Sequence, residues 1–335
     1  MLLTPECRAS VLRNGAILLG CSVAADGYAN RPLRVVTHAH SDHVKGLSRS
    51  VRESLFIIAT PVTFEMLDIL GHWIPLEKRL PLHYNQSFVF DGERVVLVPA
   101  RHIAGSAQVL VEGSEGAYGY TGDFKMPGTP PMRDLDVLVI DATYGSPRLQ
   151  RRWGEWDAIA ALLEIIERFI GEGPVWIYGF HGKLQEVMAE LRMRGVNYDF
   201  MADPKTVALA RIAEKFYGIS MEPLHVYHGG IVEDSYLVFL HSSERRVKRR
   251  MPGVHVVLTG WELQAPARLV GERVFNVSFS DHATFKEIIE YVREARPRRV
   301  IVDSTRGKDA WFTARYIEAK LGIPARAEPR EASQA

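Results

Sequence analysis

Four residues that commonly bind metal ions lie within six positions near the start of the chain, in the stretch VVTHAHSDHVKGL: His38, His40, Asp42 and His43. Imidazole and carboxylate groups are usual ligands of zinc and similar ions. Because side chains two positions apart on an extended backbone share a face, His38 and His40 can bind one ion. Asp42 and His43 come after the turn and can bind a second ion nearby. The pattern therefore predicts part of a two-metal site.

Two later residues are candidates for further ligands. His102 lies in a predicted loop after the strand RVVLVPA, and Asp123 ends the predicted strand segment AYGYTGDF. Loops at strand ends commonly carry functional side chains. We expect two groups of ligands with Asp123 shared between them: His38, His40 and His102 for one ion, and Asp42 and His43 for the other.

The second group needs a closing ligand, and two histidines qualify. His181, in YGFHGK, and His282, in VSFSDHATF, both follow a predicted strand and precede a predicted helix. The residues themselves leave this choice open. We interpret the remaining histidines as structural or surface residues: His72, His83, His225, His228, His241 and His255.

Composition indicates an ordinary globular protein. The chain has 335 residues, of which 47% are hydrophobic and 24% are charged, which suits one large domain or two medium ones. The net charge of +1 does not by itself indicate a nucleic-acid-binding protein. Strongly basic runs usually form solvated surface but also attract phosphates, and this chain has three of them: RLQRRW (148–153), RRVKRR (245–250) and REARPRR (293–299).

Nothing in the sequence predicts a membrane protein. No apolar run approaches 18 residues, and the N-terminus lacks the basic–apolar–small pattern of a signal peptide. Cys7 and Cys21 form no cysteine-type metal site, and whether they pair is left open. We expect a cytoplasmic location.

Two textures follow one another along the chain. The first part consists of short predicted strands, with a hairpin turn at Asp91–Gly92 and a helix from Pro61 to Gly71. The run DLDVLVIDATYG (134–145) predicts a buried central strand that ends at Asp141. From about 155 to 255 helices and strands alternate, which predicts an α/β unit with parallel strands.

Taken in order, the motifs resemble the metallo-β-lactamase superfamily: His-x-His-x-Asp-His, HIAGSA, YTGDF and a late SDH. The resemblance implies an αββα sandwich with a dinuclear site at one edge. The α/β stretch before the late SDH resembles the inserted domain of β-CASP nucleases, which favours His282 as the closing ligand. The implied division is a first part of the metallo-β-lactamase domain (1–152), a β-CASP insert (153–256), a second part (257–328) and a tail (329–335).

Finer motifs resemble the DNA cross-link repair and Artemis-type branch and the ligase-associated DNA exonucleases: THAHSDHVKGL, DATYGSP, YGFHGKLQEV, LTGW and SFSDHATFKEI. TYGSP and Gly260–Trp261 favour this DNA branch over the RNA 3′-end-processing branch. Two features depart from the family pattern. The segment VDSTRGKDAW (302–311) matches no motif, and the insert is short.

The resemblance implies a nuclease that hydrolyses DNA, as a 5′-to-3′ exonuclease on single-stranded or 5′-phosphorylated ends in DNA repair. Two metals would polarise the phosphate and lower the pKa of a shared water to yield hydroxide. Zinc, one or two ions per chain, is expected, with manganese or magnesium as alternatives. Asp141 matches the acidic residue after the bridging aspartate, or is a hydrogen-bonded strand-end residue, and Asp281 is a further candidate. The expected catalytic residues are Asp42, Asp123, Asp141 and His282.

Several residues are candidates for contacts to nucleic acid. Lys183 matches the family's lysine after Gly182, at a helix start where free N–H groups bind anions, and we expect it to hold a 5′-phosphate with help from Thr259. The alternative is an ordinary solvated lysine. A cleft between the domains would offer charge and stacking to a single strand, from Arg148, Arg151, Arg152 and Trp153.

Two alternative functions remain open from the sequence. An RNA-processing β-CASP ribonuclease would differ in its response to the 2′-hydroxyl. A small-molecule hydrolase of the same fold, such as a thioesterase or lactonase, would not need the basic segments. A scaffold that only binds is disfavoured by the intact ligand set.

Overall fold

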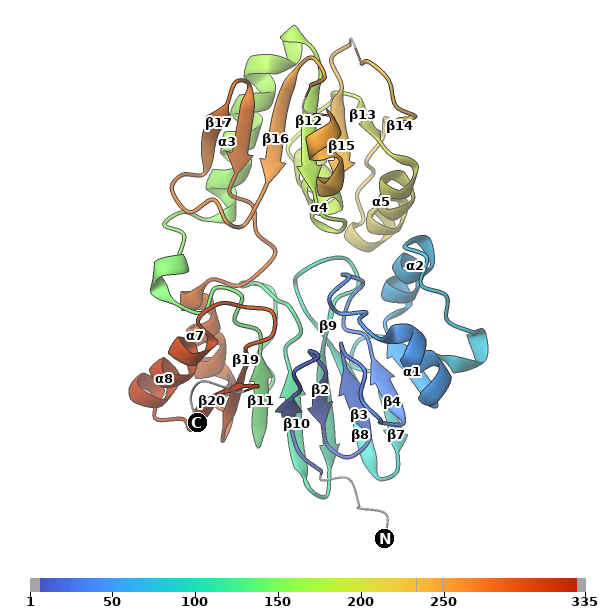
Figure 1. The fold of residues 1–335 in the computed structure, drawn as a ribbon, viewed down its shortest axis with the longest axis vertical. Coiled ribbons are helices and arrows are strands. Elements are labelled where there is room, and N and C mark those ends of the chain that lie inside the picture. The colour runs from blue at the N-terminus through green and yellow to red at the C-terminus, as the bar shows by residue number, and fades with distance from the viewer. Residues whose placement is uncertain (1–6, 233, 249, 330–335) are drawn as a thin grey trace. The chain divides into compact units, whose positions relative to one another are not determined.

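The computed structural model describes residues 7–232, 234–248 and 250–329, and the chain forms two compact units (Figure 1). The first unit combines Met1–Gln150 with His282–Ala335. The second unit comprises Arg151–Asp281. The second unit is therefore inserted between the two parts of the first.

The first unit contains a mixed sheet of six strands in chain order. These strands are β1 (Ser10–Val11), β2 (Ile17–Leu19), β3 (Val23–Ala25), β4 (Leu33–Val35), β5 (Phe56–Ala59) and β6 (Arg79–Pro81). Strands β3 to β6 pair in parallel, and β1 to β3 pair antiparallel. Helices α1 (Leu47–Glu53) and α2 (Pro61–Ile69) lie in the connections on either side of β5.

The second sheet of this unit has seven strands in the order β20-β19-β11-β10-β9-β8-β7. Their bounds are β7 (Ser87–Phe90), β8 (Glu93–Pro99), β9 (Ala107–Gly113), β10 (Gly116–Tyr120), β11 (Val137–Ile140), β19 (Val300–Asp303) and β20 (Ala325–Glu328). Strands β10, β11, β19 and β20 run parallel, so their carboxyl ends meet at one edge. Helices α7 (Phe285–Ala295) and α8 (Ala310–Leu321) pack against this sheet.

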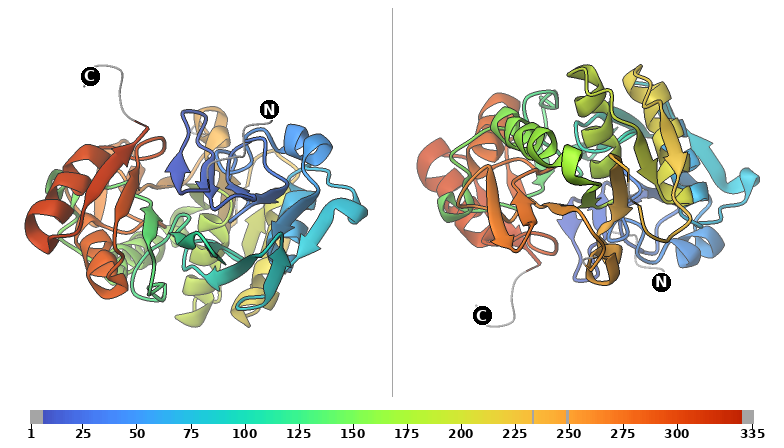
Figure 2. Two further views of the ribbon diagram at one scale, coloured as in Figure 1. Left: turned by 90° about the horizontal axis from the view of Figure 1, so that it is seen from below. Right: turned by 90° about the horizontal axis from the view of Figure 1, so that it is seen from above.

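Strand β11 shows how the sequence builds the layers. Its residues are all buried, and alternate ones enter different cores. Val137 and Val139 pack with residues of the first sheet, whereas Leu138 and Ile140 pack with α7 and α8. Figure 2 shows α1 and α2 (blue) and α7 and α8 (red) on opposite sides of the two sheets. The predicted αββα sandwich is confirmed.

The second unit is an α/β sheet in the order β14-β13-β15-β12-β16-β18-β17. All its pairings are parallel except β17 with β18. The strands are β12 (Val175–Gly179), β13 (Phe200–Ala202), β14 (Leu224–Val226), β15 (Leu237–His241), β16 (Val254–Leu258), β17 (Ala267–Gly271) and β18 (Val274–Val277). The helices are α3 (Glu155–Phe169), α4 (Lys183–Met193), α5 (Pro204–Tyr217) and α6 (Arg245–Lys248). The prediction of a parallel α/β unit is confirmed.

Four short 3₁₀ helices complete the elements of the described residues: η1 (Leu76–Lys78), η2 (Pro147–Leu149), η3 (Ile170–Glu172) and η4 (Ser242–Glu244). The hairpin turn lies at Asp91–Gly92, where both residues have positive φ. Helix α2 starts at Pro61, with Thr60 as its N-cap. Both local predictions are confirmed.

The second unit ends later than the predicted insert (153–256). A division between residues 256 and 257 would fall inside β16, and it would remove β17 and β18 from the sheet. Parallel pairing of β18 with β16 joins both strands to the second unit. The second unit ends at Asp281 because of this long-range strand pairing, which cannot be predicted from local sequence.

The structure also bears on the two cysteines and on the expected absence of a membrane-spanning helix. Cys7 and Cys21, left open by the sequence, form a disulfide. Within the described ranges, none of the helices has the length and apolar character needed to cross a membrane. The predicted tail beyond residue 329, and Arg249 of the basic run 245–250, lie outside the described residues.

Candidate metal centre

The candidate ligands of the first unit lie at the carboxyl ends of strands from both sheets. His38 and His40 follow β4, and His102 follows β8. Asp123 follows β10, and Asp141 directly follows β11. The sandwich therefore brings residues that are far apart in the chain to one edge.

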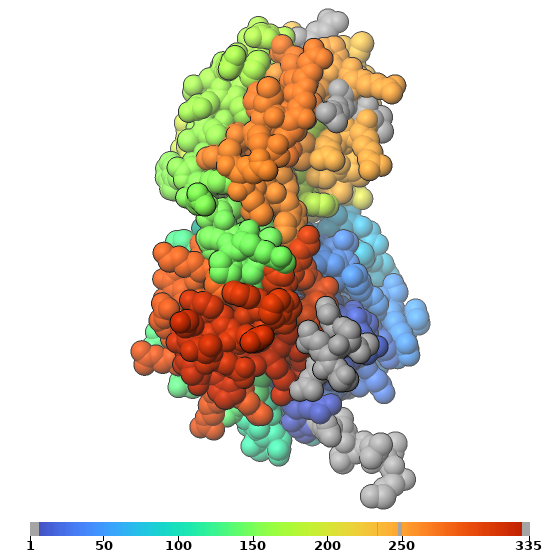
Figure 3. Space-filling model, turned by 60° about the vertical axis from the view of Figure 1, so that its left-hand side comes forward, coloured from blue at the N-terminus to red at the C-terminus, as the bar shows by residue number. Residues whose placement is uncertain are grey.

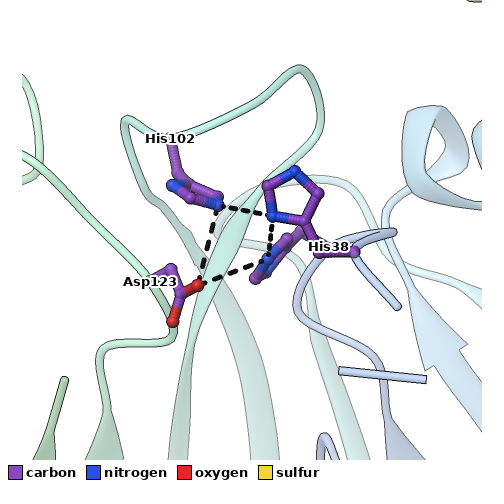
Figure 4. Close-up of side chains that lie close together, drawn as sticks. His38, His102 and Asp123 are labelled. Atoms are coloured by element: carbon purple, nitrogen blue, oxygen red, sulfur yellow. Dashed lines mark hydrogen bonds and ion pairs between the residues drawn. The ribbon is translucent and has the colours of Figure 1, made fainter. Parts of the chain in front are cut away.

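The first predicted group forms a compact cluster, in which one ligand atom each of His38, His40, His102 and Asp123 lie within 4.8 Å of one another. His40 Nδ1 is 3.1 Å from both His38 Nε2 and His102 Nε2. Asp123 Oδ2 is 3.6 Å from His38 Nε2 and 3.7 Å from His102 Nε2. Figure 4 shows His38, His102 and Asp123 directed toward one another. Ligands 2.0–2.1 Å from a tetrahedral zinc ion are about 3.3 Å apart, so the spacing suits such an ion.

The second predicted group surrounds the same aspartate. Asp123 Oδ2 is 3.1 Å from His43 Nε2 and 3.8 Å from His282 Nε2. His43 Nε2 is also 3.4 Å from Asp42 Oδ2. Asp123, Asp141 and His282 form a second cluster of ligand-type atoms within 4.8 Å. Asp123 is thus placed between two groups, as its predicted bridging position requires.

Two buried atoms at this centre support the presence of a cation. His43 Nε2 and Asp123 Oδ1 are buried, and neither makes a hydrogen bond within the part of the chain that the structure describes. Buried polar atoms are normally paired. Both atoms can donate an electron pair to a metal ion, so the donor set fits a divalent cation.

A carboxylate that the sequence did not single out orients His43. Asp26 Oδ2 lies 2.7 Å from His43 Nδ1, and both side chains are fully buried. The backbone N–H and the hydroxyl of Thr37 donate to Asp26 at 2.9 and 2.6 Å. A carboxylate at Nδ1 holds the proton there and leaves Nε2 free to bind a metal. Asp26 was missed because its partner is 17 residues away.

Asp141 has the corresponding place beside His282. Its Oδ2 lies 3.1 Å from His282 Nδ1, and its Oδ1 accepts hydrogen bonds from the N–H and hydroxyl of Thr143. Burial, and then the charge of Asp123, raise the pKa of Asp141. The arrangement turns His282 Nε2 toward Asp123. A carboxylate in this position can orient His282.

The electrostatics of the centre suit a cation. Burial opposes the charge of Asp123, but His43 and His282 lower the pKa of this carboxyl well below its usual range. Burial, and then the neighbouring His43 and His102, lower the pKa of His38, which favours the neutral ring that binds metals. Burial also opposes the charged form of His43. The carboxylates of Asp123 and Asp26 outweigh burial, however, and raise the pKa of His43. The carboxylates therefore favour positive charge here.

Arg306 connects this centre to the C-terminal segment that matched no motif. Its guanidinium is buried, with Nη1 2.8 Å from Asp303 Oδ2 and Nε 3.7 Å from Asp42 Oδ2. Nη2 donates to the carbonyls of Gly15 and Asp26 at 2.9 and 3.2 Å. The guanidinium thus joins the loop after β19 to the loop that carries Asp42. Sequence reasoning missed it because its partners are up to 291 residues away.

The predicted phosphate-binding lysine has an internal partner. Lys183 begins α4 and lies buried, with Nζ 3.2 Å from Asp281 Oδ1. The N–H of Gly182 donates to Gln185 Oε1 at 2.6 Å. Thr259 Oγ1 accepts from the N–H of Trp261. Lys183 is therefore not the solvated lysine of the alternative interpretation.

The residues predicted to line a basic cleft belong to different units. Arg148 belongs to the first unit and forms a two-point ion pair with Asp309. Arg151, Arg152 and Trp153 belong to the second unit, where Arg151 donates to the carbonyl of Gly260 at 3.2 Å. A shared cleft stays a prediction. His181 also lies in the second unit, whereas His282 belongs to the first.

The fold and the site define a class of protein. Residues 29–172 match the family described as Beta-lactamase superfamily domain. The chain belongs to the metallo-β-lactamase superfamily. The resemblance inferred from the motifs is thereby confirmed.

Several particular proteins are similar to this chain. "Uncharacterized protein in lig 3′region" of Acidianus ambivalens is 38% identical over 138 residues, which are 40% of this chain and 97% of that protein. A "Probable DNA ligase" of Opitutus terrae is 28% identical over 315 residues, 86% of this chain and 29% of that protein. "5′ exonuclease Apollo" of Gallus gallus is 26% identical over 311 residues, 86% of this chain and 63% of that protein. The chain thus spans less than two thirds of the latter two.

A solved structure shares the fold. It is a protein of unknown function from Enterococcus faecalis V583, 14% identical, with a TM-score of 0.55. The match covers 81% of this chain and 74% of the other. At this identity the likeness concerns the fold alone.

Proposed function

We propose that the protein is a metal-dependent nuclease that hydrolyses phosphodiester bonds of DNA. The observation that carries this proposal is the cluster of His38, His40, His102 and Asp123 at the strand ends. The similarity to a 5′ exonuclease over 86% of this chain, and to a probable DNA ligase, supports a nuclease acting on DNA.

The finer proposal is a 5′-to-3′ exonuclease for single-stranded or 5′-phosphorylated ends, acting in DNA repair. It is supported by the similarity to the 5′ exonuclease Apollo of Gallus gallus. We propose zinc as the metal, in one or two ions per chain, since imidazole and carboxylate ligands suit it; manganese and magnesium are the alternatives. A cytoplasmic location stays a prediction.

The chain's own residues prepare the site for this chemistry. A bound divalent ion would supply Lewis acidity toward a phosphoryl oxygen and a nucleophile derived from water at neutral pH. Asp26 holds the Nδ1 proton of His43, and Asp141 lies at Nδ1 of His282. Both rings therefore present Nε2 toward Asp123. This fixed geometry reduces the reorganisation needed during the reaction.

The test of the function is a substrate panel given to metal-loaded protein. The panel contains single-stranded DNA and RNA of the same sequence, each with a 5′-phosphate or a 5′-hydroxyl. The assay measures which end of each strand is shortened. We expect DNA to be digested from the 5′ end. Preferential RNA cleavage would contradict the DNA proposal and favour an RNA-processing enzyme. Absence of cleavage with metal bound would favour a small-molecule hydrolase.

Lys183 is proposed to select the 5′-phosphate together with Gly182 and Thr259, because its ammonium lies at the start of α4. A phosphate there would compete with Asp281 for Nζ. Lys183→Ala should bring the rates for 5′-phosphorylated and 5′-hydroxyl DNA closer together. Lys205→Ala, an exposed lysine on α5, is the matched control. An unchanged ratio in Lys183→Ala would remove this residue from phosphate recognition.

A further inference from the structure

The segment that matched no family motif forms one wall of a pocket in the first unit. The pocket has a volume of about 760 Å³. Ser304 and the stretch 307–311 contribute residues from the loop after β19 and the start of α8, and Arg148 contributes from the segment after β11. The other walls come from α8 and β20. We propose that this pocket binds nucleotides of the single-stranded DNA that continues from the bond being cut, an inference that rests on the proposed function.

The pocket lies at the same edge of the sheet as the candidate metal centre. Strands β11, β19 and β20 are parallel neighbours, so Asp141 and the loop that follows β19 lie at their carboxyl ends. Neighbouring strands are about 4.8 Å apart. The pocket wall at β20 is therefore two strands, about 10 Å, from the strand that ends at Asp141. A short stretch of an extended nucleic-acid strand can span this distance.

Direct contacts connect the pocket wall to the metal centre. The N–H of Gly145 donates to the carbonyl of Lys308 at 3.1 Å, and Tyr144 forms a bridge with Lys308. The ring of Tyr144 is 6.4 Å from the ring of His282. Figure 3 shows the C-terminal part of the first unit (red) at the surface of the molecule. The buried residues of the TYGSP motif thus pack directly against the segment 302–311.

The lining carries an excess of positive charge. Its charged residues are four cations and one carboxylate: Arg148, Lys308, Arg315, Arg326 and Asp309. Asp309 holds Arg148 in place through Nε and Nη2, at 2.7 and 2.5 Å, and the described part of the chain gives the other donors of this guanidinium no partner. Arg315 is exposed, and no ion pair of its side chain occurs among residues 7–232, 234–248 and 250–329. This charge suits a phosphate backbone.

The pocket also offers an aromatic face for a base. Trp311 lines it from the first turn of α8, and 49% of this residue is exposed. Four alanines also line the pocket, and their short side chains leave room for a planar group: Ala310, Ala314, Ala325 and Ala327. Stacking on exposed aromatic rings beside cations is the usual recognition of single strands. An acidic peptide would use the charge but not the stacking face.

The experiment measures binding separately from cleavage. Fluorescence anisotropy with a labelled single-stranded DNA oligonucleotide is recorded in an Asp123→Asn background, so that the strand stays intact. Trp311→Ala and Arg315→Ala are added to that background. Trp73→Ala and Arg133→Ala are the controls, because both residues are exposed and outside the pocket.

Binding should weaken in both pocket variants and in neither control. Loss of one stacked base should reduce affinity about fivefold or more. Removal of one phosphate contact by Arg315→Ala should lower the slope of log affinity against log salt by about 0.7. Equal affinity and slope in all variants would overturn the proposal. So would absence of binding by the background protein itself.

Cleavage assays separate this inference from the proposed function. In the unaltered background, the pocket variants should raise KM for oligonucleotides while the hydrolysis of bis(p-nitrophenyl) phosphate, too small to reach the pocket, is unchanged. If DNA is cut and KM is the same in wild type and variants, the pocket idea alone is contradicted. If the strand binds through the pocket but is not cut, the nuclease proposal alone is contradicted.

Discussion

His43 and His282 each have a buried carboxylate at Nδ1, and this pairing explains how single residues prepare the site. Asp26 and Asp141 occupy these positions at 2.7 and 3.1 Å. The ligand-type residues at 38–43 could be predicted because their spacing is local. Asp26 could not, because no local pattern distinguishes it from an ordinary turn aspartate before Gly27.

Asp26→Asn should weaken metal binding roughly 10–100-fold, because outer carboxylates of this kind fix the ring that binds the metal. The measurement is a titration of metal-free protein with zinc, followed by a competing chelator dye. Asp203→Asn, at the N-cap of α5 in the other unit, is the control and should leave zinc affinity unchanged. Equal affinities of wild type and Asp26→Asn would contradict the orienting role.

Arg306→Ala should lower the free energy of unfolding by about 3–5 kcal/mol, because it removes the charged partner of the buried Asp303 carboxylate. Arg306→Lys should lose less, since the charge is kept although the fork of donors is lost. Urea denaturation monitored by circular dichroism measures both. A loss below about 1 kcal/mol in Arg306→Ala would show that the ion-pair cluster is dispensable.

Secondary-structure elements bring the ligands together through their ends. The turn at Asp91–Gly92 and the helix start at Pro61 could be predicted, because each depends on the backbone preference of one or two residues. The extent of the second unit could not, since it depends on which strand β18 pairs with. The same holds for the ion pair between Arg148 and Asp309, 161 residues apart.

Thr284→Ala should lower the free energy of unfolding by about 1 kcal/mol. Thr284 caps α7, and Glu287 completes the capping box through its contacts to the N–H and hydroxyl of Thr284. This helix begins three residues after His282, so the cap also fixes the approach of that ligand. Thermal unfolding compares Thr284→Ala with Ser48→Ala, because Ser48 is exposed on α1 and is not the N-cap of that helix. Equal losses in the two variants would contradict the capping role.

The contact of Asp309 with the segment after β11 should depend on pH. Hydrogen bonding to Arg148 lowers the pKa of Asp309 below its usual value of 3.8. A lowered pKa in the folded state stabilises the protein above pH 3.8, and this stabilisation is lost as the pH falls through the folded pKa. Asp309→Asn should therefore unfold at a lower temperature than wild type at pH 7.

The difference in melting temperature between wild type and Asp309→Asn should shrink below about pH 4. Differential scanning fluorimetry from pH 3 to pH 7 follows it. Asp134→Asn, an exposed aspartate in the first unit, provides the control for a general loss of charge. A difference that stays constant over this range would contradict the assignment to the ionised Asp309 pair.

At the scale of the whole molecule, two compact units have separate roles in the proposed function. The first unit carries the candidate metal ligands and the pocket beside them. The second unit carries Lys183, the proposed selector of the 5′-phosphate. The superfamily could be recognised from the sequence, because its short motifs follow one another along the chain in the order typical of that superfamily. Substrate preference could not be read in the same way, since it depends on surfaces built from distant segments.

The central claim is that the histidine–aspartate cluster is a metal centre that cuts DNA. The most direct measurement is the rate of nucleotide release from 5′-phosphorylated single-stranded DNA by zinc-loaded wild type, His102→Ala and His83→Ala, with bound zinc determined for each. His83 is an exposed histidine outside the cluster.

Wild type and His83→Ala should release nucleotides at equal rates. His102→Ala should lose bound zinc and more than about a hundredfold in rate, because removal of a direct ligand exceeds the effect of an outer partner. Full activity of His102→Ala, or no release by zinc-loaded wild type, would contradict the account.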